Sequence, residues 1–247
     1  MYSDIGGQNI YYQKVGRGKN LILIHGWGES VSSFWPIVDL LKEDFTLWLI
    51  DLPGFGKSDL PKRTFTALDF AKIIAGFIKK NNIEKPTVFG HSFGGKVAIQ
   101  LAKTYPDLID KLILEGSSGI KPERSFFQVL IFPFVKIGHF LLPNVFNIKS
   151  QIQNILYKKL ESDYVNVGKM KDIFLRTIKE NISVDLPKIQ TETLLIWGEK
   201  DRAVPLKYGK KMYHLIPKSK LVVLENTGHF PHVKQAERVA YYVKDFI

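Results

Sequence analysis

The chain of 247 residues contains no cysteine. This absence excludes a disulfide framework, a thiolate metal site and a cysteine nucleophile. Acidic residues are also few: 24 Asp and Glu stand against 35 Lys and Arg, which gives a formal net charge of +11. The basic residues are spread along the chain and no nucleic-acid-binding motif accompanies them, so we expect no nucleic-acid partner.

Long apolar segments free of polar residues are lacking as well. Residues 125–148 are numerous enough to cross a bilayer, but two prolines, a lysine and a histidine interrupt them. We therefore expect a helical hairpin there, with peripheral membrane contact as the alternative. Residues 1–15 lack the basic start, apolar stretch and cleavage site of a signal peptide, which favours a cytoplasmic protein.

Hydrophobic residues make up 45% of the chain, which is typical of a protein with a sizeable core. Strand-like apolar runs alternate with helix-like segments, and this predicts the α/β fold class: a mostly parallel central sheet with helices on both faces. Strands are expected at 10–15, 21–25, 45–50, 87–90, 111–114, 193–197 and 220–224. Helices are expected at 33–42, 66–81, 93–105, 206–215 and 234–246.

The alternation stops at residues 117–187, which show apolar and helix-like segments but no convincing strand pattern. We expect these residues to form an inserted helical cap on a core made of residues 1–116 and 188–247. Apolar cap side chains are candidates for a substrate pocket, and packing of the cap onto the core is the alternative interpretation. The candidates are Phe126, Phe127, Phe132, Phe134, Phe140 and Leu141.

A serine lies at the junction of an expected strand and an expected helix. The residues Gly90-His91-Ser92-Phe93-Gly94 match the pattern G-x-S-x-G in the strand-turn-helix context that the pattern requires. Glycines beside a nucleophile on a sharp turn allow a strained backbone and close packing. Ser92 is the candidate nucleophile, and His91 is interpreted as structural.

Two backbone N–H groups near this serine are candidates for an oxyanion hole. The strand at 21–25 ends in the loop Gly26-Trp27-Gly28, where the N–H of Trp27 can face a developing oxyanion. The N–H of Phe93 directly follows Ser92 at a helix N-terminus, which favours negative charge. His25, at the end of the strand, is interpreted as structural.

An acid and a base follow later strands. Asp201 comes just after the strand at 193–197, where sites in α/β sheets are built, and Glu199 and Glu115 are the alternatives. His229 follows the last strand, and His232 is the alternative base. Imidazole can accept the hydroxyl proton of serine near neutral pH, and an aspartate can hold the imidazole tautomer. These roles require no metal and no organic cofactor.

The motifs HGWGES, DLPGFGKSD, GHSFGG, WGEKD and NTGHFPH, spread over essentially the whole chain, resemble those of α/β-hydrolase-fold enzymes. That family shows its triad in the order found here, Ser92, Asp201 and His229. The resemblance implies a serine hydrolase of the carboxylesterase type that acts on a small ester, with short to medium acyl chains, as a monomer or homodimer. A serine at the turn disfavours the relatives that use an aspartate nucleophile.

Within the family, HGWG and FTLWLIDLPGFGKS are similar to pimeloyl-carrier-protein methyl esterase, which implies an acidic carrier protein as partner. That enzyme usually has G-W-S-x-G, whereas this chain has His91 in place of the tryptophan. A lactonase, a thioesterase and a carbon–carbon bond hydrolase remain alternatives with the same triad. A lipase-like enzyme at membranes and a ligand receptor with slow turnover are further alternatives.

Overall fold

The computed structural model describes residues 1–121 and 164–247 of the chain. Eight strands form one sheet in the order β1-β2-β4-β3-β5-β6-β7-β8. The strands are β1 (Tyr2–Asp4), β2 (Asn9–Gly16), β3 (Lys19–Ile24), β4 (Phe45–Ile50), β5 (Thr87–His91), β6 (Lys111–Glu115), β7 (Glu192–Gly198) and β8 (Ser219–Leu224).

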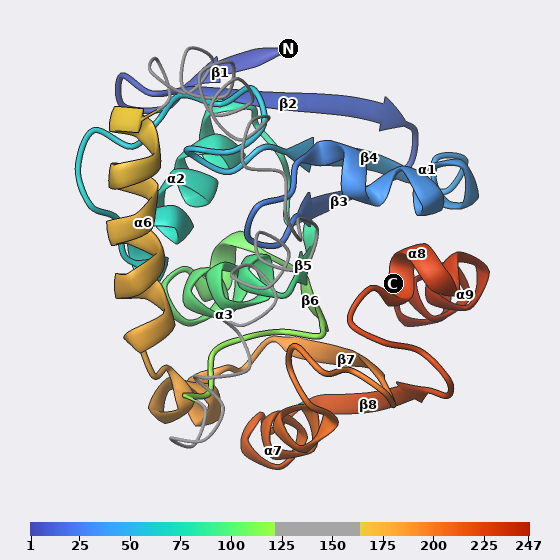
Figure 1. Ribbon diagram of the computed structural model, residues 1–247. Helices are drawn as coiled ribbons and strands as arrows, with labels where there is room; N and C mark the ends of the chain where they lie inside the picture. Colours follow the sequence, from blue (N-terminus) through green and yellow to red (C-terminus); the bar gives the residue numbers. More distant parts are fainter. Residues whose placement is uncertain (122–163) are drawn as a thin grey trace, which may run out of the picture.

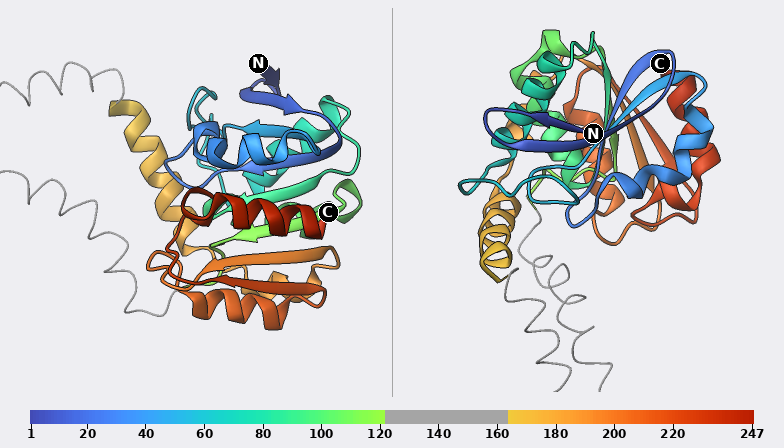
Figure 2. Two further views of the ribbon diagram at one scale, coloured as in Figure 1. Left: turned by 90° about the vertical axis from the view of Figure 1, so that its right-hand side faces the viewer. Right: turned by 90° about the horizontal axis from the view of Figure 1, so that it is seen from above.

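Helices cover both faces of this sheet (Figures 1 and 2). One face carries α1 (Trp35–Leu41), α8 (Pro231–Lys234) and α9 (Ala236–Phe246). The other carries α2 (Ala67–Lys80), α3 (Phe93–Thr104) and α7 (Leu206–Leu215), with α6 (Tyr164–Lys179) beside α2. Short 3-10 helices are η1 (Val31–Phe34), η2 (Pro106–Leu108) and η4 (Ser183–Lys188).

Among the described strands, those from β3 to β8 pair in parallel, and β1 and β2 alone are antiparallel to their neighbours. Side chains of β3 alternate between two buried clusters: Ile22 and Ile24 pack with α2 and α3, whereas Leu21 and Leu23 pack with α1 and α9. Because helices cover both faces, the central strands are apolar along most of their length. The expected α/β class, with a mostly parallel sheet, is confirmed.

The order of the strands reverses around β3, which has β4 on one side and β5 on the other. The chain leaves β3 toward α1 on one face and leaves β5 toward α3 on the opposite face. Such a reversal opens a crevice at the carboxyl ends of the strands, where α/β proteins bind ligands. The loops that carry Trp27 and Ser92 begin at these two strand ends.

Three elements differ from the expectation. The edge strand β1 was not expected, since three residues show no periodicity that a sequence pattern can reveal. The segment expected as one helix at 33–42 is the end of η1 followed by α1. The helix expected at 234–246 is α9, which begins at Ala236, and Lys234 belongs to the separate short helix α8. Gln235 separates these last two helices with non-helical backbone angles (φ −136°, ψ 50°), and its side chain donates to Glu225 O at 2.8 Å.

Between β6 and β7 the described residues form α6 and η4 and contain no strand. The boundaries of the inserted cap, 117–187, stay a prediction. The apolar stretch 125–148 and the six candidate cap residues of the sequence analysis, Phe126, Phe127, Phe132, Phe134, Phe140 and Leu141, lie outside the described residues.

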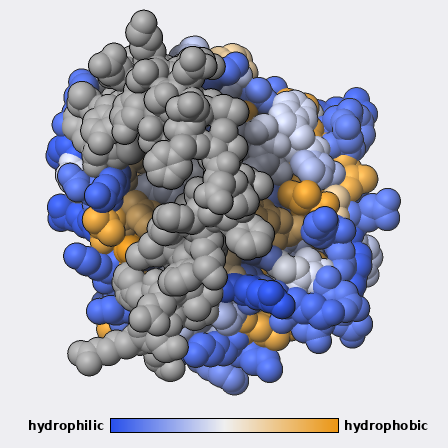
Figure 3. All heavy atoms as spheres, in the orientation of Figure 1, coloured by the Kyte–Doolittle hydropathy of each residue, from blue (hydrophilic) through white to orange (hydrophobic). Residues whose placement is uncertain are grey.

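The part of the surface seen in Figure 3 is mainly hydrophilic, with apolar side chains in smaller patches. Among residues 1–121 and 164–247, no helix has both the length and the apolar character needed to span a bilayer.

Candidate active site

Ser92 lies at a sharp turn between β5 and α3, with a left-handed backbone (φ +51°, ψ −111°). Such a conformation costs a non-glycine residue about 1–3 kcal/mol, so the surroundings must hold it in place. Its N–H donates to Glu115 O at 2.9 Å, and its carbonyl accepts from the N–H groups of Gly95 and Ser118 at 3.1 and 3.0 Å. The turn is therefore fixed by backbone hydrogen bonds from β6 and the residues that follow it.

The glycines around Ser92 are required by close packing of backbone against backbone. A Cβ on Gly90 would lie 2.5 Å from the carbonyl oxygen of Gly94. A Cβ on Gly94 would overlap the carbonyl oxygens of Ile24 and His25 at the end of β3. The pattern G-x-S-x-G thus lets α3 begin directly against two strands of the sheet.

His229 lies between Ser92 and Asp201 and contacts both. Its Nε2 is 3.0 Å from Ser92 Oγ, and its Nδ1 is 2.8 Å from Asp201 Oδ2. An ionised carboxylate only accepts hydrogen bonds, so Nδ1 carries the proton and the Nε2 lone pair faces the hydroxyl. The other carboxylate oxygen, Oδ1, accepts from the N–H groups of Ala203 and Val204 at 2.9 and 2.8 Å, which fixes the carboxylate.

The alternative acids and the alternative base have other partners. Glu199 accepts from Asn226 N at 3.1 Å on the surface. Glu115 is fully buried and pairs with His232 at 2.5 Å. The structure thus brings together Ser92, Asp201 and His229, the three residues that the sequence analysis selected.

Trp27 and Phe93, the candidate oxyanion donors, line the same cavity as Ser92. Phe93 is the first residue of α3, so its N–H is one of the donors that a helix leaves without an internal partner. The rings of Trp27 and Phe93 contact each other edge to face, with centroids 5.2 Å apart. Gly28 follows Trp27 with φ +79°, a backbone conformation that favours glycine and shapes this loop.

The cavity at Ser92 has a volume of about 140 Å³ and mostly apolar walls. Helix α6 supplies a part of the wall that the sequence does not predict, because helical spacing shows a face but not what the face contacts: Phe174, Thr177 and Ile178. The other wall residues that were not predicted are Lys96, Ser118, Gly119, Ile120, Glu180, Ala203, Val204 and Tyr208.

Lys96 is a cation in the wall of this cavity and is 4% exposed. Its Nζ donates to the carbonyls of Thr177 and Glu180 at 2.7 and 3.1 Å, at the C-terminal end of α6. Burial lowers the pKa of Lys96 to about 8, although the nearby carboxylate of Glu180 opposes the shift. The only signal in the sequence is a lysine among the apolar residues of the helix that follows Ser92.

His25 has the contacts of a structural residue. Its Nε2 accepts from Leu52 N at 3.0 Å, and its Nδ1 lies 2.7 Å from Gly26 O. Burial lowers the pKa of His25, which favours the neutral ring that this acceptor role needs. His25 therefore connects the loop after β3 with the loop after β4.

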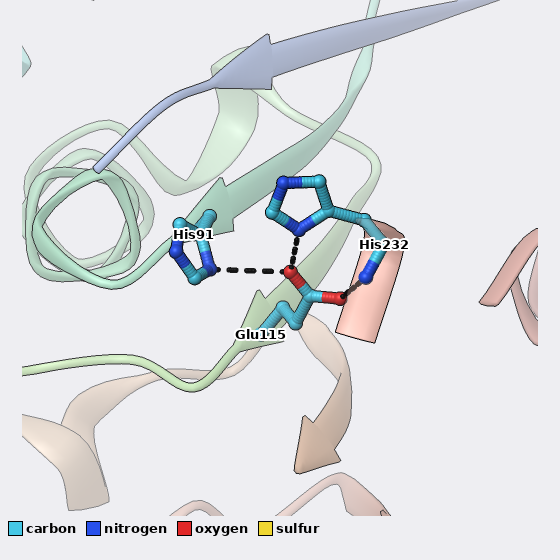
Figure 4. Close-up of side chains that lie close together, drawn as sticks. All are labelled: His91, Glu115 and His232. Atoms are coloured by element: carbon cyan, nitrogen blue, oxygen red, sulfur yellow. Dashed lines mark hydrogen bonds and ion pairs between the residues drawn. The ribbon is translucent and has the colours of Figure 1, made fainter. Parts of the chain in front are cut away.

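A second group of ionisable side chains, His91, Glu115 and His232, is fully buried (Figure 4). Their potential metal-ligand atoms lie within 4.8 Å of one another. However, His232 Nδ1 and Glu115 Oε2 are 2.5 Å apart, whereas two zinc ligands at about 2.1 Å from a tetrahedral ion are about 3.4 Å apart. The spacing is that of a hydrogen bond rather than of two ligands of one ion.

Comparisons with known proteins identify the fold family of the chain. A family model described as alpha/beta hydrolase fold matches residues 19–161 and 143–236. The uncharacterized hydrolase YugF of Bacillus subtilis (strain 168) is 28% identical over 264 residues, which cover 98% of this chain and 96% of that protein.

A second relative is 2-hydroxy-6-oxononadienedioate/2-hydroxy-6-oxononatrienedioate hydrolase 1 of Pseudomonas putida. It is 29% identical over 266 residues, which cover 97% of this chain and 92% of that protein. Among solved structures, a bacterial membrane phospholipase A superposes with a TM-score of 0.81 at 25% identity, over 100% of this chain and 84% of that one. The family model spans most of the chain, which therefore belongs to the α/β hydrolase fold family.

Proposed function

We propose that the protein is a serine hydrolase that cleaves carboxylic esters through an acyl-enzyme intermediate on Ser92. The observation that carries this proposal is the continuous hydrogen-bonded chain from Ser92 Oγ through His229 to Asp201, with distances of 3.0 and 2.8 Å. A serine hydroxyl needs an adjacent base to become a nucleophile, and the base needs an orienting carboxylate. Both conditions are met here, and Ser92 and His229 line one cavity.

In the proposed reaction, Ser92 Oγ attacks the ester carbon while His229 Nε2 takes the hydroxyl proton. The N–H groups of Trp27 and Phe93 stabilise the oxyanion, and Asp201 stabilises the imidazolium that forms. His229 then returns the proton to the leaving alcohol, which leaves an acyl group on Ser92. Water, activated by the same imidazole, hydrolyses the acyl-enzyme and regenerates the hydroxyl.

The cavity supports a preference for short to medium acyl chains. Its volume of about 140 Å³ is smaller than the roughly 300–1,000 Å³ of pockets that hold drug-sized ligands. Phe174, Ile178 and Val204 give it apolar walls, which suit a hydrocarbon chain rather than a polar one.

The test is hydrolysis of p-nitrophenyl esters from acetate to laurate by the wild type and by Ser92→Ala. We expect turnover by the wild type with an optimum among the shorter chains, and none above background for the variant, with an unchanged circular dichroism spectrum. A lactone and a thioester belong in the same panel, because the same triad can cleave both. Turnover retained in Ser92→Ala would refute the assignment.

A carbon–carbon bond hydrolase is the second candidate function. The observation that favours it is the similarity to the Pseudomonas putida hydrolase of 2-hydroxy-6-oxononadienedioate, at 29% identity over nearly the whole chain. Ser92 and His229 could act on a ketone carbonyl as on an ester, but a carbon leaving group must then receive the proton. Loss of the absorbance of such a dienoate, without hydrolysis of p-nitrophenyl esters, would favour this second function.

An acidic carrier protein as partner remains part of the proposal. The net charge of +11 supports it, because a positive surface attracts a negative partner over distance. The test compares kcat/KM for a methyl ester attached to an acyl carrier protein with that for the free methyl ester, at low and at high salt. A preference for the carrier-bound ester that salt removes would support the partner, and equal values would exclude it.

A further inference from the structure

Four ionisable side chains form a continuous line behind the candidate triad. Glu29 Oε1 lies 3.4 Å from His91 Nε2, and His91 Nδ1 lies 3.1 Å from Glu115 Oε2. The same Glu115 oxygen lies 2.5 Å from His232 Nδ1, and Oε1 of Glu115 accepts from the backbone N–H of His232 at 2.8 Å. Figure 4 shows the inner three residues, which are fully buried.

Each member of this line belongs to a segment that carries part of the site. Glu29 Oε2 accepts from the N–H of Gly26, in the loop of the candidate oxyanion donor Trp27. His91 directly precedes Ser92, and the backbone carbonyl of Glu115 accepts from the N–H of Ser92 at 2.9 Å. The fourth member, His232, lies on the segment that carries His229. The line therefore joins the four segments on which nucleophile, base and oxyanion donors depend.

Proton positions follow from the arrangement. An ionised carboxylate only accepts hydrogen bonds, so Nδ1 of His232 carries the proton of its contact with Glu115 Oε2. The contacts of His91 with Glu115 and Glu29 have ion-pair distances, 3.1 and 3.4 Å, but neither ring nitrogen of His91 has hydrogen-bond geometry. A protonated His91 between these two carboxylates compensates the charge of both.

The pKa shifts of His91, Glu115 and Glu29 have the directions expected for a cation between two carboxylates. Burial alone would lower the pKa of His91, but the carboxylates of Glu115 and Glu29 outweigh it and raise this pKa to about 9. Burial alone would raise the pKa of Glu115, but His232 and His91 outweigh it and lower this pKa to about 2. The pKa of Glu29 is also about 2, because its contacts with His91 outweigh its burial.

The line touches the candidate base directly. The ring of His91 lies against that of His229, with centroids 4.8 Å apart, and against that of His232, also at 4.8 Å. Within the described part of the chain, the ionisable groups around His91 are those of His25, Glu29, Glu115, His229 and His232. His91 therefore contacts both Glu115 and His229, so a change in the charge of Glu115 can alter the position of the His229 ring through the ring of His91.

We propose that Glu115 is a positioning residue for the hydrolysis proposed above: through His91 and His232 it holds Ser92 and His229 at hydrogen-bond distance. It touches neither the substrate nor the reacting atoms. The inference rests on the proposed function, because the reaction concerned is the proposed ester hydrolysis. The effect of Glu115 on the reactivity of Ser92 can nevertheless be measured without an ester substrate.

The test variant is Glu115→Gln, which keeps the shape of the side chain and removes its charge. The first readout is the second-order rate constant with which a fluorophosphonate labels Ser92, since labelling needs the nucleophile, the base and the oxyanion donors but no specific acyl chain. We expect labelling, and kcat for the best p-nitrophenyl ester, to fall about 10- to 100-fold, as a displacement of about 1 Å can cost. KM should stay within about threefold, because Glu115 does not line the cavity.

The pH profile of labelling distinguishes positioning from packing. In the wild type the rate should fall as His91 loses its proton near pH 9, because a neutral imidazole no longer compensates the charges of Glu29 and Glu115. In Glu115→Gln one of the carboxylates that raise the pKa of His91 is gone, so this alkaline decline should move to lower pH. A residue with a merely structural role would lower the melting temperature and leave the profile of the folded enzyme unchanged.

Asp185→Asn is the matched control. Asp185 is another largely buried carboxylate, which pairs with Lys103 at 3.0 Å and accepts from Gln100 at 3.2 Å, and it contacts none of the four segments. We expect this variant to lose stability but to label at the wild-type rate. Equal labelling rates and equal pH profiles for Glu115→Gln and the wild type would overturn the inference.

If Glu115→Gln does not fold, Glu29→Gln tests the same line from its partly exposed end, where the side chain is 17% exposed. We expect slower labelling and an alkaline decline at lower pH in Glu29→Gln as well, and an unchanged rate and profile would overturn the inference.

The result of these tests is separable from the result for the proposed function. A wild type that labels at Ser92 but cleaves no ester would overturn the proposed function alone.

Discussion

His229 and His232 lie on one segment but have different partners: Nε2 of His229 is 3.0 Å from Ser92 Oγ, and Nδ1 of His232 is 2.5 Å from Glu115 Oε2. The side chain of His229 is 15% exposed, whereas that of His232 is fully buried. Only His229 can meet a substrate in the cavity. From the sequence, His229 was the candidate base and His232 the alternative. Their different burial and different partners identify His229 as the histidine that can act on Ser92.

The contact between Asp201 and His229 predicts a large kinetic effect of Asp201→Asn. An asparagine can donate toward Nδ1 and so favours the wrong imidazole tautomer, and in triad enzymes this change lowers kcat by about 10⁴-fold. We expect kcat for the best p-nitrophenyl ester to fall by about 10³- to 10⁴-fold, with little change in KM. Glu199→Gln, two residues earlier and on the surface, is the control and should keep wild-type kcat. A loss below tenfold in Asp201→Asn would argue against its role as the orienting acid.

The packing of Gly94 predicts a loss of stability in Gly94→Ala. The added Cβ would meet the carbonyl oxygens of Ile24 and His25, and backbone atoms cannot move aside as a flexible side chain can. We expect the free energy of unfolding in urea to fall by about 1–3 kcal/mol or more. Gly228→Ala is the matched control, since a Cβ there meets nothing within 4 Å, and its stability should stay near that of the wild type. Equal stabilities for the two variants would contradict this account of the turn.

The buried line predicts a defined pH dependence of stability. The pKa of His91 is raised from 6.5 to about 9, so its contribution is complete below pH 6.5 and is lost as the pH rises toward 9. The pKa values of Glu29 and Glu115 are lowered from 4.5 to about 2, so their contributions are complete above pH 4.5 and are lost as the pH falls toward 2.

Urea unfolding from pH 3 to pH 10 measures this dependence. We expect the difference in free energy of unfolding between the wild type and Glu115→Gln to be largest between about pH 4.5 and 6.5 and to decline on both sides, because the variant lacks the carboxylate that titrates together with His91. The difference removes groups that both proteins share, such as Lys96, whose lowered pKa of about 8 makes stability rise above that pH. Declines of equal slope in the two proteins would show that Glu115 and His91 are not linked in this way.

The position of Ile178 in the cavity wall predicts a change in acyl preference in both directions. Ile178→Ala enlarges the cavity and should shift the optimum among p-nitrophenyl esters to longer chains, whereas Ile178→Phe should shift it to shorter ones. A shift of one or two methylenes is worth about 1–3 kcal/mol in discrimination. An optimum that moves in neither variant would show that the acyl chain does not contact this part of α6.

Much of the core and the triad could be predicted from the sequence, because both depend on local patterns. Apolar runs mark buried strands, and in a parallel sheet their carboxyl ends meet at one edge. Ser92, Asp201 and His229 each follow such a run, so their proximity is a consequence of the topology.

What could not be predicted depends on register and tertiary packing. His91 and Glu115 are neighbours because β5 pairs with β6 in the register that sets these two residues side by side, and the sequence does not state that register. Phe174 and Ile178 line the cavity because α6 packs near Trp27 and Lys96, which the amphipathic pattern of α6 alone does not determine. The edge strand β1 has three residues, too few for any pattern to show.

The most direct test of the account is the mass of the protein quenched during turnover of a p-nitrophenyl ester, followed by mapping of the modified peptide. The account predicts a transient population heavier by one acyl group, with the acyl group on Ser92. Steady turnover without an acyl adduct, or an adduct on another residue, would contradict the central claim that Ser92 is the nucleophile activated by His229.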